Sequence, residues 1–218
     1  MPTAATPRPL IVGQPVLVVV DIQQSSFMPP PVSPDPSVRV GIPRMPGYRE
    51  RFLRAPEIVG AARAAGIPVV FFKEVHRRTL VDFGRELDGD EGIHCLDGDA
   101  RTEVAAILNV GPDDYVIAKR RYSCFFGTDL EILLKGLKAE TLVLIGGLTD
   151  VCVHYTFVDA HQHDYVVRVV EDCVSGSSLA AHQASLNAME YLQNGALRTT
   201  DDVIAAFRAH GAARAAAE

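Results

Sequence analysis

Cys152 stands where an apolar segment gives way to a helical one, in the sequence IGGLTDVCV over residues 145–153. The N–H groups at the start of a helix favour a thiolate over a thiol, and a thiolate is a strong nucleophile. The same N–H groups form a pocket for a negative oxygen. We therefore expect Cys152 to act as a nucleophile. The alternative is a small buried hydrophobe, which is the usual role of a cysteine in an apolar segment.

Two residues of complementary chemistry also follow apolar runs. Asp21 comes directly after VLVVV at 16–20, and Lys119 comes after YVIA at 115–118. A carboxylate can take a proton from a thiol, and an ammonium group balances the charge. Because the carboxyl ends of parallel strands share one edge of a sheet, we expect Asp21, Lys119 and Cys152 to meet there. Taken singly, each charged residue would be assigned to the solvated surface.

The elements that must position these residues are visible as five β-branched runs with almost no polar residue. The runs cover residues 16–21, 67–73, 115–119, 141–146 and 166–171. Such runs are typical of parallel strands covered on both faces. Helical patterns alternate with them at 52–65, 100–109, 128–138, 152–163, 178–193 and after 201. The sequence therefore predicts a three-layer α/β/α sandwich with a mostly parallel sheet of five to six strands, residues 196–200 adding the sixth.

Length and composition set the class of protein. The 218 residues, of which 48% are hydrophobic, predict one domain over 1–218, with tails at 1–13 and 211–218. A net charge of −6 argues against a nucleic-acid partner. The four cysteines show no C-x-x-C spacing, so neither a zinc knuckle nor a thioredoxin-type pair is expected. No run approaches the ~20 apolar residues of a membrane span, and no signal peptide is recognisable, so we expect a cytoplasmic protein with a small-molecule substrate.

Three spaced motifs carry a resemblance to a known family. They are VDIQ at 20–23 with Phe27, KRRYSCF at 119–125 followed by GTDLE at 127–131, and GLTDVCV at 147–153 with Thr156. In this order and over nearly the whole chain, the sequence resembles the isochorismatase-like cysteine hydrolases. That family includes nicotinamidases, N-carbamoylsarcosine amidase, biuret hydrolase and ureidoacrylate amidase.

The resemblance implies roles for the residues of the predicted site. It implies a catalytic triad of Asp21, Lys119 and Cys152, in which Asp21 is the base and Lys119 holds the charge balance. It also implies a cis peptide bond between Gly147 and Leu148. The N–H groups of Leu148 and Cys152 would then form an oxyanion hole.

Four aromatic residues lie close in sequence to the triad and are candidates for substrate contacts: Phe27, Tyr122, Phe125 and Tyr155. Aromatic walls are common in small-molecule sites. The alternative for each residue is a place in the hydrophobic core.

A metal site is the one cofactor that the resemblance raises. Glu74 and His76, Asp82, and the pair His94-Cys95 fall where nicotinamidases carry metal ligands, and His76, Asp82 and His94 could hold a divalent ion. Glu74 and Asp82 depart from that pattern, and Arg77 and Arg78 put positive charge nearby. The alternative is a polar loop that includes His76, Arg77 and the pair Arg85-Glu86, and no other cofactor is expected.

The function that follows is hydrolysis of a small amide or ureido C–N bond through a thioester, releasing ammonia or a small amine. The motifs look closer to biuret and carbamoylsarcosine hydrolases than to nicotinamidases. The alternatives are vinyl-ether hydrolysis of the isochorismate type, which Cys152 disfavours, and a noncatalytic member that only binds. The resemblance also suggests a homo-oligomer, dimer or tetramer, using 29–46 or the helix from Ser178. Long loops at 29–46 and 77–99 interrupt the pattern, and one of them is expected to cover the site.

Overall fold

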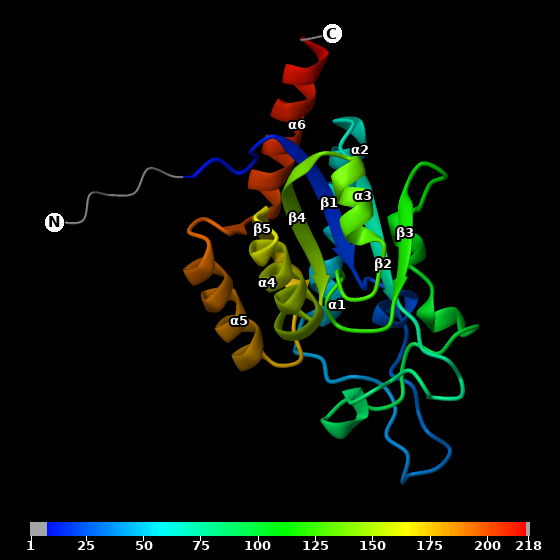
Figure 1. Cartoon of the computed structure of the whole chain (residues 1–218). Coiled ribbons are helices and arrows are strands. Elements are labelled where there is room, and N and C mark those ends of the chain that lie inside the picture. The colour runs from blue at the N-terminus through cyan, green and yellow to red at the C-terminus, as the bar shows by residue number, and fades with distance from the viewer. Residues whose placement is uncertain (1–7, 217–218) are drawn as a thin grey trace, which may run out of the picture.

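The computed structural model describes residues 8–216, and this part of the chain forms one six-stranded sheet. The strand order is β3-β2-β1-β4-β5-β6, and every neighbouring pair is parallel. The strands are β1 (Gln14–Val20), β2 (Val69–Glu74), β3 (Tyr115–Lys119), β4 (Ala139–Gly147), β5 (Val166–Ser175) and β6 (Leu197–Arg198). The predicted three-layer α/β/α sandwich is confirmed (Figure 1). The short strand β6 is the sixth strand and lies at one edge of the sheet.

Helices cover both faces of the sheet. One layer holds α1 (Tyr48–Phe52), α2 (Ala55–Ala64) and α6 (Thr200–Ala215), and the other holds α3 (Leu130–Gly136), α4 (His154–Gln162) and α5 (Leu179–Leu192) (Figure 1). On the central strand β1, Leu17 and Val19 pack into the first layer, whereas Val16 and Val18 pack into the second. Because both faces are buried, this strand carries no polar residue at these positions.

Strand β3 departs from the expected burial on both faces. Tyr115 and Val116 are 39% and 46% exposed. The reason is topological, since β3 is an edge strand with β2 as its single neighbour in the sheet. Its last residue, Lys119, is nevertheless buried, and this is the end of the strand that contributes to the site.

The prediction of a helix at 100–109 is wrong. The structure has two separate 3-10 turns there, η3 (Ala100–Thr102) and η4 (Ala106–Leu108). Between them Val104 forms an antiparallel bridge with Gln23, and the Ala105 N–H donates to the Ile22 carbonyl at 2.9 Å. These long-range bonds keep the backbone extended where a continuous helix would have to pass.

The C-terminal helix is longer than the sequence predicted. α6 continues past His210 to Ala215 and extends beyond the end of the sheet (Figure 1). The Thr199 side chain accepts the N–H of Asp202, whose carboxylate accepts the N–H of Thr199, so both ends of this capping box are formed. The parts of the expected tails at 1–7 and 217–218 lie outside the described residues. Across residues 8–216, no helix is both long and apolar enough to cross a bilayer.

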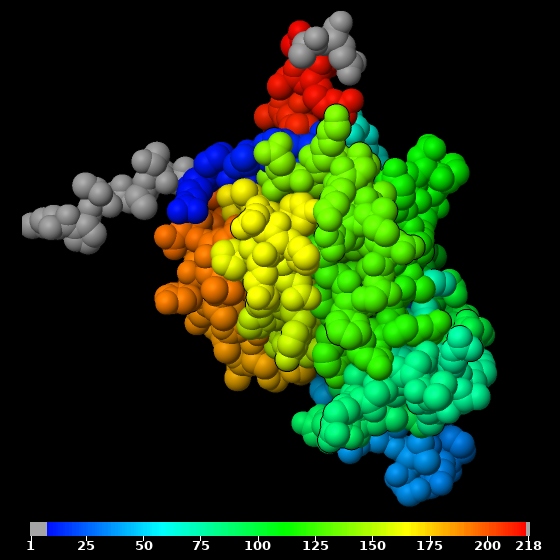
Figure 2. Space-filling view, in the orientation of Figure 1, coloured from blue at the N-terminus to red at the C-terminus, as the bar shows by residue number. Residues whose placement is uncertain are grey.

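Two long loops lie together beyond the carboxyl ends of the strands (Figures 1 and 2). Residues 29–46 and 77–99 pair through a parallel bridge between Val40 and Ile93, and the Ile93 N–H donates to the Arg39 carbonyl at 2.8 Å. Gly92 is required at this crossing, since a Cβ there would lie 2.4 Å from the Arg39 carbonyl carbon. Both loops therefore help to close the edge of the sheet where ligands bind in such folds.

Candidate active site

Three chain segments bring the predicted triad together. Asp21 follows β1, Lys119 ends β3, and Cys152 lies in η5 (Thr149–Val153), a short π-helical segment that leads into α4. The Lys119 Nζ lies 2.8 Å from Asp21 Oδ2 and donates to Cys152 Sγ at 3.3 Å. All three side chains are buried. A carboxylate, an ammonium group and a thiol thus share one buried point at the sheet edge.

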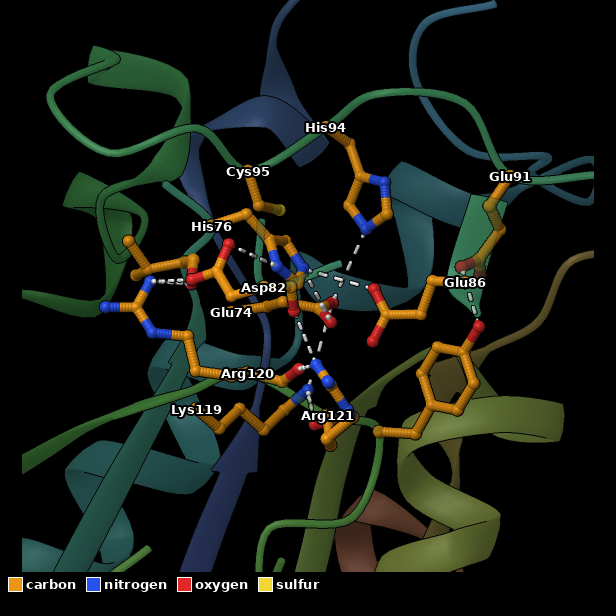
Figure 3. Close-up of polar contacts among 12 residues, drawn as sticks. Glu74, His76, Asp82, Glu86, Glu91, His94, Cys95, Lys119, Arg120 and Arg121 are labelled. Atoms are coloured by element: carbon orange, nitrogen blue, oxygen red, sulfur yellow. Dashed lines mark hydrogen bonds and ion pairs between the residues drawn. The ribbon is translucent and has the colours of Figure 1, made fainter. Parts of the chain in front are cut away.

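Glu74 adds a second carboxylate to this group. It ends β2 and is the register partner of Lys119 on β3. The Lys119 Nζ lies 3.8 Å from Glu74 Oε2 and donates to the Arg121 carbonyl at 3.0 Å (Figure 3). A fully buried lysine is rare unless it is paired, and these partners account for Lys119.

The charges of this group follow from burial and pairing. Burial would lower the pKa of Lys119, but the nearby carboxylates of Asp21 and Glu74 outweigh this effect and hold that pKa well above its usual value. Burial raises the pKa of the Asp21 carboxyl, and the opposing effect of Lys119 does not cancel the rise. Lys119 is therefore a fixed cation, and Asp21 is a stronger base than an exposed carboxylate.

Cys152 rests as a thiol. Burial raises the pKa of the Cys152 thiol well above its usual value, and Lys119 opposes this rise without reversing it, because Asp21 and Glu74 add to it. Burial and the two carboxylates thus oppose the effect that the helix N-terminus has on this thiol. In this site a proton acceptor must take the thiol proton as sulfur attacks, and Asp21 is placed for that step within 4.8 Å.

The turn before Cys152 depends on a glycine and contains a cis bond. Gly146 has φ +118°, and a Cβ at this position would lie 1.9 Å from the Val20 carbonyl oxygen on β1. The peptide bond between Gly147 and Leu148 is cis, which confirms the expectation. The Leu148 carbonyl then accepts the N–H groups of Val151 and Val153 at the start of the helical segment.

The cavity beside the thiol, which we call the Cys152 cavity, is small. Its volume is about 30 Å³, close to the space of a single water molecule. Its lining consists of Asp21, Gln23, Ser25, Ser26, Ile42, Tyr48, Glu74, Glu91, His94, Cys95, Gly147, Leu148 and Cys152. Leu148 and Cys152 both line it, so the two residues assigned to the oxyanion hole face the same space.

Tyr122 and Tyr155 lie beside the Cys152 cavity without lining it. Their rings are 5.9 Å apart and line a surface crevice that also includes Glu91. The Tyr122 hydroxyl donates to Glu91 Oε2 at 3.1 Å. Because Glu91 also lines the Cys152 cavity, the two hollows meet at this carboxyl, and substrate contact by either tyrosine stays a prediction.

Phe27 and Phe125 lie further from the thiol. Phe27 lines a separate crevice on the surface, where the Arg49 guanidinium is 6.0 Å from its ring. Phe125 stacks on His163 with ring centroids 5.2 Å apart, and it packs against the core on the α4 side of the sheet. Neither residue lines the Cys152 cavity, so their proposed role in substrate binding also stays a prediction.

Next to the triad the structure gathers two histidines and two carboxylates, which we call the His–Glu cluster: Glu74, His76, Glu86 and His94. The His76 Nε2 lies 3.1 Å from Glu86 Oε2 and 3.4 Å from Glu74 Oε1 (Figure 3). Burial would lower the pKa of His76, but the nearby carboxylates of Glu74 and Glu86 outweigh this effect and raise the pKa to about 9. In the absence of a bound ion, a protonated His76 faces both carboxylates, and Lys119 faces Glu74 as well.

The His–Glu cluster also fits a divalent ion. One ligand atom from each of its four residues lies within 4.8 Å of the others, and neither Glu86 oxygen has a hydrogen-bond partner among the described residues. The His94 Nδ1 lies 2.7 Å from the Gly92 carbonyl, and its Nε2 faces Glu74 at 3.7 Å. A carbonyl behind the outer ring nitrogen is the usual arrangement around a metal-binding histidine.

The ligand set of this cluster differs from the one expected from the sequence at two residues, Asp82 and Glu86. Asp82 was expected among the ligands, but its carboxylate accepts the Arg77 N–H and pairs with Arg120 at 3.3 Å, leaving it 3.8 Å from the other nitrogen of His76. Glu86, which the sequence analysis named only in the alternative of a polar loop, is buried at the start of the turn η2 (Glu86–Asp88) and belongs to the cluster.

The Gln23 side chain connects the end of β2 to the turn η3 beside the site. Its side-chain amide nitrogen donates to the carbonyls of Glu74, at 2.9 Å, and Thr102, at 2.5 Å. Its position two residues after Asp21, in the motif VDIQ at 20–23, was the available signal for a role near the site. Tyr48 lines the Cys152 cavity from α1, and nothing in its sequence surroundings indicated this.

The fold and this buried group of a thiol, an ammonium and carboxylates define a class of α/β protein with a nucleophile site at the sheet edge. Residues 15–211 match the family model described as the isochorismatase domain. The chain belongs to the isochorismatase family.

Relatives and solved structures agree with this assignment. The chain is 32% identical to the ureidoacrylate amidohydrolase RutB of Methylorubrum extorquens over 166 residues, which are 68% of this chain and 62% of that protein. N-carbamoylsarcosine amidase from Thermoplasma acidophilum is similar with a TM-score of 0.71 and 26% identity, covering 87% of this chain and 98% of that one. The pyrazinamidase of Pyrococcus horikoshii in complex with zinc has the same fold, with a TM-score of 0.69, 24% identity, and coverage of 86% and 98%.

Proposed function

We propose that the protein is a cysteine-dependent amidohydrolase that cleaves the C–N bond of a small amide or ureido compound. The observation that carries the proposal is the position of the Lys119 ammonium group, 2.8 Å from the Asp21 carboxylate and 3.3 Å from the Cys152 sulfur. A base and a fixed cation at a nucleophile are the parts that acyl transfer needs.

The first half of the reaction forms a thioester. Asp21 takes the Cys152 proton while the sulfur attacks the substrate carbonyl carbon, and the N–H groups of Leu148 and Cys152 stabilise the oxyanion. Asp21 then gives the proton to the leaving nitrogen. Ammonia or a small amine departs as the C–N bond breaks, and the acyl group remains on sulfur. Lys119 keeps its proton throughout and stabilises the negative charge as it moves between sulfur and carboxylate.

Water completes the cycle. Asp21 takes a proton from a water molecule that attacks the thioester carbonyl, and the same two N–H groups bind the second oxyanion. The C–S bond breaks, the sulfur regains a proton from Asp21, and a carboxylic or carbamic acid leaves.

The relatives support the choice of bond. RutB is named for ureidoacrylate hydrolysis, and the amidase from Thermoplasma acidophilum is named for N-carbamoylsarcosine, so both names describe ureido compounds. The matched segment spans 62% of the length of that RutB, so its substrate is not transferred to this chain. We propose a ureido compound as the first class to test, in keeping with the motifs around Lys119 and Cys152.

The test is release of ammonia from a panel of amides, ureas and carbamoyl compounds. The wild-type protein should release ammonia from at least one ureido compound, and Cys152→Ala should release none. Cys173→Ala is the matched control, because Cys173 is also a buried free cysteine but lies in the core near α1 and α6. Hydrolysis that survives in Cys152→Ala would refute the mechanism, and binding without hydrolysis across the panel would favour a noncatalytic role.

We also propose that the His–Glu cluster holds a divalent cation beside the triad. Glu74, His76, Glu86 and His94 would be its ligands, a set of nitrogen and oxygen donors suited to zinc or manganese. When bound, such an ion supplies a Lewis acid that polarises a substrate carbonyl. His94 lines the Cys152 cavity, so the cluster and the nucleophile border the same space.

The expected homo-oligomer stays a proposal as well. The candidate contacts are residues 29–46 and α5, whose Leu179 and Tyr191 are 57% and 85% exposed. Large exposed apolar side chains on one helix are typical of contact surfaces. Light scattering at micromolar concentration should give a mass at least twice that of the 23.6 kDa chain, and a mass near 23.6 kDa would refute the proposal.

A further inference from the structure

The two N–H groups of the proposed oxyanion hole belong to residues at either end of a short turn. Leu148 precedes η5, and Cys152 lies within it. Leu148 occupies the N-cap position of η5, and its apolar side chain makes no capping hydrogen bond. Its carbonyl accepts the N–H groups of Val151 and Val153, which fixes the turn from within. The side chains that fix the turn come from another part of the chain.

This outside support comes from the segment that joins β5 to α5. The Thr149 hydroxyl lies 2.9 Å from Nδ1 of His182 on α5. The carboxylate of the next residue, Asp150, accepts the Ser177 N–H at 2.8 Å and the Ser177 hydroxyl as well. Two consecutive residues between the two N–H donors are therefore held by residues 177–182.

The contact between the turn and α5 is buried and tightly packed. Thr149 is fully buried, and His182 is 5% exposed. Gly176 lies so close to this contact that a Cβ there would be 2.5 Å from Asp150 Oδ1 and 3.0 Å from His182 Cβ. Within residues 8–216, the Thr149 hydroxyl has no hydrogen-bond partner other than His182. Loss of the imidazole would therefore leave a buried hydroxyl unpaired.

His182 is neutral near pH 7 and is separated from the substrate. Burial lowers the pKa of its imidazole, Arg51 lowers it further, and Asp150 opposes both effects without cancelling them. A neutral imidazole nitrogen accepts a hydrogen bond from a hydroxyl or donates one to it, according to its tautomer. Neither His182 nor Thr149 lines the Cys152 cavity. The histidine therefore acts on the turn and does not contact the reacting atoms.

We propose that His182 is a positioning residue, which holds Thr149 so that the N–H groups of Leu148 and Cys152 point at the same oxygen. The inference rests on the proposed amidohydrolase function and adds the residue that fixes its oxyanion hole. One donor of such a hole is worth about 100- to 1000-fold in kcat, provided that it lies within hydrogen-bond distance of the oxyanion. Because this bond forms in the transition state, a loosened turn should lower kcat and leave KM nearly unchanged.

Two substitutions at His182 separate the hydrogen bond from packing. His182→Phe keeps a ring and removes the polar nitrogen, whereas His182→Asn is smaller but places an amide group close to the position of Nδ1. With a substrate from the ammonia assay, His182→Phe should lower kcat about 10- to 100-fold, the usual cost of a small misplacement in an active site. His182→Asn should recover most of that loss. A role in packing alone predicts the reverse order, and kcat values in that order would overturn the proposal.

Variants of the partner show whether the effect passes through the hydroxyl. Thr149→Val removes the hydroxyl and should lower kcat as His182→Phe does, whereas Thr149→Ser keeps it and should lose much less. The double variant Thr149→Val/His182→Phe should lose little more than either single variant, because both remove the same bond. Losses in kcat that multiply in the double variant would show that His182 does not act through Thr149.

His154→Phe is the matched control. The His154 Nδ1 lies 3.1 Å from the Ser185 hydroxyl, so this histidine also bonds a hydroxyl between neighbouring helical segments. Its bond joins α4 to α5 and does not involve Thr149 or Asp150. The kcat of His154→Phe should therefore stay close to that of the wild type. A loss as large as that of His182→Phe would overturn the assignment.

A test without turnover separates this inference from the proposed function. When the Cys152 thiol adds to isotope-labelled acetaldehyde, the S–C bond forms, the carbonyl π electrons move to oxygen, and Asp21 takes the thiol proton. The adduct, measured by carbon NMR and absent in Cys152→Ala, places an oxyanion in the hole. His182→Phe should weaken this adduct about tenfold or more. Alkylation of Cys152 by iodoacetamide forms no oxyanion, and its rate should stay nearly unchanged.

The outcomes of the two assays are independent. A weakened adduct with unchanged alkylation, in a protein whose wild type hydrolyses no compound of the panel, would contradict the amidohydrolase and support the positioning role. Equally stable adducts in the wild type and His182→Phe would overturn the positioning role and leave the amidohydrolase intact. Melting temperatures of both His182 variants show that the compared proteins are folded.

Discussion

The Lys119 ammonium group lies 2.8 Å from the Asp21 carboxylate, although β2 separates the strands that end in these two residues. The lysine side chain reaches across the end of β2, and Glu74 at that end faces the same ammonium at 3.8 Å. The pair is inaccessible to water on the lysine side, with 0% of that side chain exposed. We therefore expect substitutions in the Lys119–Asp21 pair to change both the activity and the stability of the protein.

Lys119→Met should be inactive and markedly less stable. Removing one partner of a buried ion pair costs about 3–5 kcal/mol, since it leaves the Asp21 and Glu74 carboxylates without their cation. Urea denaturation measures the loss. The control Lys135→Met removes an exposed lysine paired with Glu131 and should leave the free energy of unfolding nearly unchanged.

The double variant Asp21→Asn/Lys119→Met isolates the pair. It should recover part of the free energy of unfolding, because one of the two stranded carboxylates is gone, but no activity. Equal stability of Lys119→Met and the wild type would show that the buried pair contributes nothing to the free energy of unfolding.

The activity should have an acid limb set by Asp21. Burial raises the pKa of this carboxyl above its usual 3.8, and the proposed base must be deprotonated. Activity is therefore present above the raised pKa and is lost as the pH falls through it, with a midpoint above pH 3.8. The measurement is kcat/KM against pH, with circular dichroism at each pH to show that the fold persists. Full activity down to pH 3.8 in a folded protein would exclude Asp21 as the base.

Metal content should depend on Glu86. After incubation with zinc or manganese chloride and desalting, the wild-type protein should retain about one ion per chain by elemental analysis, and Glu86→Gln should retain much less. Asp88→Asn is the control, because Asp88 lies on the same turn but is exposed and paired with Arg85. Equal metal content in wild type and Glu86→Gln would remove Glu86 from the ligands.

Gly146→Ala should destabilise the protein strongly. The added Cβ would lie 1.9 Å from the Val20 carbonyl, and φ +118° disfavours any L side chain. Gly60→Ala is the matched control, since Gly60 lies in α2 with open space around it and should gain stability from alanine. The melting temperatures of the two variants should move in opposite directions. A Gly146→Ala protein as stable as wild type would show that the turn tolerates a side chain.

The strand ends of the site were predictable because burial left a clear pattern. Asp21 and Lys119 each close an apolar run, and parallel strands align their carboxyl ends at one edge. The thiol position followed from the turn before Cys152. What the pattern could not show was its charge state, because the pKa of Cys152 is raised by burial, and further by Asp21 and Glu74, only in the folded chain.

The loop residues were less predictable for a physical reason. Glu86 and Glu91 lie in a segment without hydrophobic periodicity, whose course is fixed by pairing between Val40 and Ile93, far apart in the chain. The segment 100–109 has helix-forming residues, yet the bond from Ala105 to Ile22 holds it extended. In such segments long-range contacts decide which side chains turn inward, and local sequence does not.

The central claim is that Cys152 forms the covalent intermediate, and peptide mapping by mass spectrometry after acid quench of a turning-over reaction tests it most directly. Cys95 is an internal control, because its thiol lines the same cavity. Among the hydrogen bonds and ion pairs of residues 8–216, none shorter than 4.0 Å joins Cys95 to Lys119 or Asp21. The account predicts a substrate-derived acyl mass on the peptide that contains Cys152, absent in Cys152→Ala. An adduct on Cys95, or continued turnover in Cys152→Ala without any adduct, would contradict it.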